Sequence, residues 1–198
     1  MARVLQRQWR KMSRIPDIVS WAESSAGFYL PETRKPIQLA EHQKDILRHV
    51  LSINGDGRMP YDTVVYSTPK KSGKTTLGAM VAEYFALFIE PPNELFILAN
   101  SLEQSQGRAF KSLSRSVRLN RHLKQRTASL AKSIRFDNGT DVIALSSDYA
   151  TAAGSNHGLT IWDELWAYLS ENSRRLFDEL TPVPVSYTHL TLPTTPYV

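Results

Sequence analysis

Residues 67–76, in the order STPKKSGKTT, combine the residue types that can bind a nucleoside triphosphate. The apolar residues 63–66 before them predict a strand, and the apolar pattern over 77–89 predicts a helix. In this strand–loop–helix order, backbone N–H groups at the helix start can hold phosphates. Lys74 then reaches the β and γ phosphate oxygens, and the Thr75 hydroxyl binds Mg²⁺. The segment therefore predicts a site for ATP and Mg²⁺.

The loop departs from the usual pattern G-x-x-x-x-G-K-[ST], because Thr68 stands in place of the first glycine. A Gly-Lys-Thr tripeptide alone is a weak signal, since a loop lysine before a helix is usually only solvated. The strand and the helix on either side make the nucleotide site the better interpretation.

A second motif follows at residues 159–164, where a mostly apolar strand is predicted to end in Asp163 and Glu164. The aspartate can hold the Mg²⁺ shell, and the glutamate can polarise the attacking water. The alternative is an acidic helix start, where both residue types are favoured anyway. Because both motifs occur in the right order and on the right elements, ATP hydrolysis is the better interpretation.

Bulk properties narrow the class of protein. The 198 residues suffice for one well-packed domain and are few for two. A net charge of +5 and an isoelectric point near 9.5 suit a nucleic-acid partner. The absence of cysteine excludes disulfides and cysteine-ligated metals. No apolar run has membrane-spanning length, and the basic N-terminus lacks the apolar core of a secretory signal, so we expect a cytoplasmic protein without membrane contact.

The remaining pattern alternates helices and strands. A helix is predicted over 40–52, a buried strand over 95–99, a helix over 102–117, and a hairpin or strand pair over 134–145 around an Asn-Gly turn. This alternation predicts an α/β fold with a largely parallel sheet and a ligand at the carboxyl ends of its strands.

With both motifs placed, the chain from about 14 to 183 resembles the ATPase half of the large terminase subunit of tailed bacteriophages. The segments that carry the resemblance are 69–76, 99–106, 153–158 and 161–168. Members of that family often lack the first loop glycine, as this chain does. The resemblance implies an ASCE-type P-loop NTPase, a three-layer sandwich around a mainly parallel sheet, that hydrolyses ATP to drive DNA into a procapsid.

The resemblance also implies residue roles. Lys70 lies where terminases often carry a basic residue near the γ-phosphate, and with Lys74 and Glu164 it completes the expected catalytic set. Thr75 and Asp163 would hold Mg²⁺. Gln43 looks like the glutamine that reads the adenine edge, with a solvent-facing helix residue as an equal alternative. The loop residues expected to bind the nucleotide are Pro69, Lys70, Lys71, Ser72, Gly73, Lys74, Thr75 and Thr76.

The expected organisation has three parts. Residues 1–60 form an N-terminal segment that precedes the core on the side where the adenine would bind. Residues 61–183 form an incomplete P-loop ATPase core, and residues 184–198 form a non-native tail. The tail is rich in Thr and Pro and resembles translated sequencing-adapter read-through, with an ordinary frayed terminus as the alternative. We therefore expect a fragment. It would lack the nuclease domain and the motif through which the family couples ATP hydrolysis to movement. We also expect its sheet to have an exposed edge.

The partners implied are double-stranded DNA, the portal protein, the small terminase subunit and further copies of the chain in a ring, in the cytoplasm of the infected host. Lys111, Arg115 and Arg118 fall at helical spacing and could contact DNA phosphates, with a solvated helix face as the alternative. Two other functions remain open: a helicase-like translocase, and an ATP-binding module without turnover.

Overall fold

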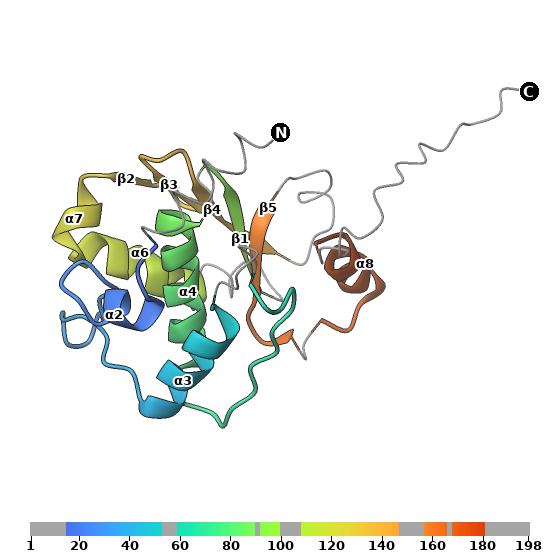
Figure 1. Ribbon diagram of the computed structural model, residues 1–198. Helices are drawn as coiled ribbons and strands as arrows, with labels where there is room; N and C mark the ends of the chain where they lie inside the picture. The colour runs from blue at the N-terminus through green and yellow to red at the C-terminus, as the bar shows by residue number, and fades with distance from the viewer. Residues whose placement is uncertain are drawn as a thin grey trace, which may run out of the picture.

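A five-stranded sheet forms the centre of the computed structural model, which describes residues 15–52, 59–89, 92–99, 108–146, 157–165 and 168–180 (Figure 1). The strands lie in the order β2-β3-β4-β1-β5. Their bounds are Glu94–Ala99 (β1), Thr127–Ser129 (β2), Ser133–Phe136 (β3), Asp141–Ser146 (β4) and His157–Trp162 (β5). β1 runs parallel to β4 and β5, and β3 runs antiparallel to β2 and β4. The predicted α/β fold is confirmed.

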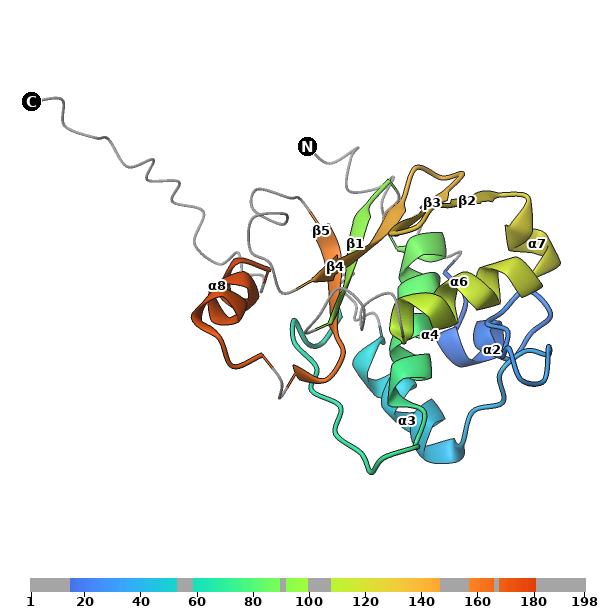
Figure 2. The same ribbon diagram turned by 180° about the vertical axis from the view of Figure 1, so that it is seen from behind.

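Helices cover both faces of the sheet. Their bounds are Ile18–Ala22 (α2), Glu41–Val50 (α3), Lys74–Phe88 (α4), Ala109–Leu119 (α6), Arg121–Lys124 (α7) and Glu171–Leu180 (α8). Figures 1 and 2 both place α4 on one side of the sheet and α8 on the other. Within the described ranges, none of these helices is both long enough and apolar enough to cross a bilayer.

The alternation of side chains along β1 explains the layers. Leu95 and Ile97 belong to the apolar cluster around α4, whereas Phe96 and Leu98 belong to a second cluster with α8. Successive strand residues point to opposite faces, so an apolar run of this length is buried on both sides. This gives the expected three layers of helix, sheet and helix.

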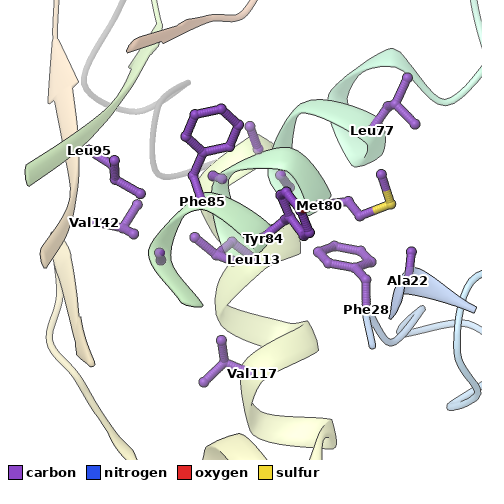
Figure 3. Packing of buried hydrophobic residues seen from close by; sticks show 14 of the residues in the cluster. Ala22, Phe28, Leu77, Met80, Tyr84, Phe85, Leu95, Leu113, Val117 and Val142 are labelled. Carbon is purple, nitrogen blue, oxygen red and sulfur yellow. The ribbon is translucent and has the colours of Figure 1, made fainter. Parts of the chain in front are cut away.

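The core around α4 also includes the N-terminal part of the described chain. Phe28 is fully buried beside Met80 of α4 (Figure 3). The rings of Trp21 and Tyr84 lie 5.5 Å apart between their centroids. Residues 15–52 therefore pack on α4, the helix that follows the predicted phosphate loop at residues 67–73.

The strand predicted over residues 63–66 is not formed, and that prediction was wrong. This segment pairs with no strand of the described sheet, and the exposed fractions of Val64 and Val65 are 48% and 76%. A strand needs a neighbour for its N–H and C=O groups, and among the described residues β5 has a partner on one side alone. Apolar sequence is therefore not sufficient for a strand here.

The predicted Asn-Gly hairpin is confirmed between β3 and β4. Gly139 has a φ of +88°, in the left-handed region that glycine adopts without strain. Its N–H donates to the Phe136 carbonyl at 3.0 Å, which closes the turn. The Asn138 side chain donates to the Ala86 carbonyl of α4 at 2.8 Å, so the turn is also fixed to the helix.

A carboxylic acid is buried between α4 and α6. Glu83 is fully buried, and burial raises the pKa of its carboxyl group to about 8, an effect that the Ser116 hydroxyl partly opposes. The same hydroxyl accepts a hydrogen bond from the Tyr29 N–H at 2.9 Å. Glu83 therefore lies beneath the contact between the N-terminal segment and α6, and it carries a proton at neutral pH.

We expect the free energy of unfolding to fall as pH rises from about 4.5 to 8. The folded chain retains the Glu83 proton over this window, whereas the unfolded chain, with an ordinary pKa of 4.5, loses it. The slope approaches about 1.4 kcal/mol per pH unit. Glu83→Gln removes this contribution, so urea denaturation should find the variant more stable than the parent at pH 8. The exposed Glu32→Gln is the control, and parallel parent and Glu83→Gln profiles would contradict the prediction.

Candidate nucleotide site

The phosphate loop is held by its own side chains before α4 begins. Gly73, the residue before the helix, has a φ of +81°, where a side chain would be strained. The Ser72 hydroxyl donates to the Pro69 carbonyl at 2.8 Å and also forms a short hydrogen bond with the Thr68 hydroxyl. Thr68, which replaces the usual glycine, thus supports the loop through its side chain.

Lys74 folds back over this loop. Its Nζ donates to the Thr68 carbonyl at 2.7 Å, and the side chain is half-buried. Gly73 provides no side-chain cap, so the first N–H groups of α4 remain available to an anion. The helix start thus combines backbone donors that no side chain of Gly73 caps with an ammonium group that donates to a backbone carbonyl.

Close packing of α4 on β5 brings the two motifs together. A Cβ on Gly78 would lie 3.2 Å from Ile161 Cγ2, so the absence of a side chain there allows the helix to approach the strand. One turn earlier on α4, the Thr75 hydroxyl donates to Asp163, at 3.3 Å from Oδ1 and 3.4 Å from Oδ2. The two residues predicted to hold the metal are therefore adjacent.

Asp163 is fixed at the end of β5 and half-buried. Its N–H donates to the Leu98 carbonyl of β1 at 3.0 Å. The pKa of the Asp163 carboxyl is raised, chiefly because the group is buried. The negative charge of Glu164 also raises it. The hydrogen bond from Thr75 and the nearby cations oppose this shift. A divalent cation would favour the charged form at this position.

The oxygen atoms of Thr75 and Asp163 suit Mg²⁺. This ion usually binds through one or two carboxylates, with substrate phosphates and water completing its shell. Within the described ranges, no group of three or more His, Cys, Asp or Glu residues could hold a metal by itself. The donor set therefore fits a metal that is held jointly by the protein and the phosphates.

Glu164 lies one residue beyond Asp163 but points to a different element. Its φ of +58° is uncommon for a residue with a side chain, and it turns the backbone at once after the aspartate. Glu164 Oε1 accepts a hydrogen bond from an Arg108 guanidinium nitrogen at 3.1 Å. The sequence did not predict this partner. The one feature of the sequence that could have indicated this partner is the position of Arg108 just before α6. A positive charge at the start of a helix interacts unfavourably with the helix dipole.

Gln43 contacts the loop from α3. Its Nε2 donates to the Ser72 carbonyl at 3.3 Å, and its Oε1 accepts from the Ala40 N–H at 3.0 Å. Both polar atoms are thus engaged within the protein, one of them with the loop. Adenine recognition by Gln43 stays a prediction, as does a role near the γ-phosphate for Lys70, which is exposed on the loop.

The predicted basic stripe lies on an exposed face of α6. Lys111, Arg115 and Arg118 are exposed on α6, opposite its buried face. Further along the chain, Arg126 and Arg135 form ion pairs with aspartates, at 2.7 and 2.8 Å. The three residues of α6 are therefore the better candidates for contacts with DNA phosphates.

The family model "Terminase large subunit, ATPase domain" matches residues 41–182. The chain belongs to this family. The match confirms the resemblance seen in the sequence and favours a terminase over a helicase-like translocase. Of the segments that carried the resemblance, most of 99–106 and 153–158 lies outside the described residues.

Solved structures show the same fold. The "Crystal structure of the HK97 bacteriophage large terminase" matches this terminase domain with a TM-score of 0.64 at 24% sequence identity. The match covers 77% of this chain and 31% of the other, so the chain spans about a third of that terminase. No curated protein sequence matches the chain.

Proposed function

We propose that this terminase domain binds Mg²⁺-ATP at the phosphate loop and hydrolyses it. The contact between Thr75 and Asp163 carries the proposal. It joins a hydroxyl and a carboxylate that are 88 positions apart, with an oxygen–oxygen distance of 3.3 Å, at the helix start where the phosphates would bind. Neither motif alone provides this arrangement.

Each residue then has a separate task. The loop N–H groups and the start of α4 hold the phosphates, and Lys74 exchanges the Thr68 carbonyl for the β and γ oxygens. Thr75 and Asp163 would hold Mg²⁺, which would supply positive charge beside the phosphates. Lys70 lies close to the γ-phosphate, and Glu164 orients the attacking water.

We further propose that the intact protein is a viral DNA-packaging motor, in which ATP hydrolysis moves double-stranded DNA into the procapsid. It would act as a ring of identical subunits in the host cytoplasm, together with the portal protein and the small terminase subunit. In this proposal residues 61–183 are part of the motor core, and residues 184–198 are not native. Membership of the terminase family supports the proposal.

The test measures phosphate release by the protein continued in its native reading frame beyond residue 183. Turnover should require Mg²⁺ and stop when EDTA is added. Double-stranded DNA of unrelated sequences should stimulate it equally, because phosphate contacts carry no base readout. Stimulation should decline steeply with salt, since binding releases counterions. ATP binding without turnover under all these conditions would leave the non-hydrolysing module as the function.

A further inference from the structure

The Tyr168 hydroxyl is buried without a hydrogen-bond partner in the part of the chain that the structure describes. Tyr168 is 8% exposed and belongs to the apolar cluster between the sheet and α8. Its ring packs edge-on against Trp162, the last residue of β5, with 5.0 Å between the ring centroids. A buried hydroxyl that makes no hydrogen bond is unfavourable, and phenylalanine would fill the same space without it. The hydroxyl therefore requires an explanation.

Asp163, the residue that follows Trp162, lies within electrostatic reach of this hydroxyl. Burial raises the pKa of the Tyr168 hydroxyl, and the negative charge of Asp163 raises it further. The group therefore stays protonated at neutral pH and can donate a hydrogen bond. The Tyr168 N–H donates to the Leu165 carbonyl at 3.2 Å, which forms a turn shortly after β5. A donor without a partner thus lies near a predicted metal ligand.

The Asp163 carboxylate can accept such a hydrogen bond. Among the described residues its one hydrogen-bond partner is the Thr75 hydroxyl, and the oxygen–oxygen distances of 3.3 and 3.4 Å are longer than usual for a hydroxyl donor. Carboxylates at metal sites are generally held in place by hydrogen bonds from residues behind them. Removing such a partner weakens metal binding even though the partner does not touch the metal.

We propose that Tyr168 is a positioning residue whose hydroxyl donates to the Asp163 carboxylate when Mg²⁺-ATP is bound, and so directs that carboxylate to the metal. The inference rests on the proposed ATPase function and adds to the metal site a residue from the α8 side of the sheet. Because Tyr168 acts through Asp163, its hydroxyl affects the binding of the metal ion and not the contacts of the phosphate loop with ATP.

The experiment measures metal and nucleotide binding by the protein continued in its native reading frame beyond residue 183. Tyr168→Phe keeps the ring and removes the hydroxyl. In the presence of ATP, the Mn²⁺ concentration at half-saturation, followed by electron paramagnetic resonance, should rise about 10- to 100-fold. ATP affinity measured in EDTA should stay at the parental value. The metal-free variant should need as much urea to unfold as the parent, or more, since it loses an unpaired buried hydroxyl.

Tyr66→Phe is the matched control, because the Tyr66 hydroxyl is also buried without a hydrogen-bond partner in the described ranges. This variant should likewise need no less urea to unfold, and it should bind Mn²⁺ as the parent does. The comparison separates the loss of a donor to Asp163 from the loss of any buried phenol.

An unchanged Mn²⁺ half-saturation in Tyr168→Phe, the same rise in Tyr66→Phe, or a loss of ATP affinity in EDTA would each overturn the inference. A Tyr168→Phe variant that unfolds at less urea than the parent would also overturn it, because the hydroxyl would then be paired in the metal-free protein. In these cases the parent still binds ATP in a Mg²⁺-dependent manner, and the proposed function stands. A parent without Mg²⁺-dependent ATP binding overturns the proposed function, and the inference with it.

Discussion

Replacing Glu164 by glutamine is expected to leave Mg²⁺-ATP bound while hydrolysis falls by roughly 10²–10⁴-fold, the usual effect of losing a general base. The amide has the shape of the carboxylate but lacks the charge that orients and deprotonates water. Glu164 also lies beyond the Thr75–Asp163 contact and is not part of it, so nucleotide affinity should stay at the parental value. Phosphate release measures the expected loss of hydrolysis, and equilibrium binding of ATP on the same sample measures the expected unchanged affinity.

Asp163→Ala separates the two carboxylates. Asp163 contacts Thr75, so its loss should weaken the metal-dependent part of nucleotide binding itself. The two variants should therefore differ in kind: one binds without turnover, and the other binds poorly. If Glu164→Gln turned over ATP at the parental rate, the role of orienting water would belong to another carboxylate.

Replacing Lys74 by alanine is expected to abolish detectable Mg²⁺-ATP binding. The ammonium group lies over the loop, 2.7 Å from the Thr68 carbonyl, at the start of the helix that would face the phosphates. Its removal deletes the positive charge that we expect to lie closest to the β and γ oxygens. A fluorescent ATP analogue or calorimetry measures the loss, and circular dichroism establishes that the fold is retained.

Lys35→Ala is the matched control for this loss, because Lys35 is exposed on the turn before α3 and far along the chain from the loop. It removes the same charge from the protein and should leave ATP affinity unaltered. Equal affinity in the parent and in a folded Lys74→Ala variant would falsify the assignment of the phosphate loop.

The sequence by itself determined the features that depend on local chemistry. Gly73 before Lys74 predicts a loop that enters a helix, and the helix begins there. The Asn-Gly turn predicts the hairpin, because few residues adopt the left-handed conformation found at Gly139. Amphipathic spacing predicts the buried and basic faces of α6. Each of these features arises from residues that are neighbours in the chain.

Tertiary structure alone decided which distant groups meet. Residues 63–66 have the composition of a strand but no ladder partner among the described strands, and strand formation requires one. Thr75 contacts Asp163 because Gly78 allows α4 to approach β5. Arg108 reaches Glu164 because two parallel strands end at one edge, and because the backbone turns sharply after Asp163. Such contacts depend on packing between segments that local sequence patterns do not encode.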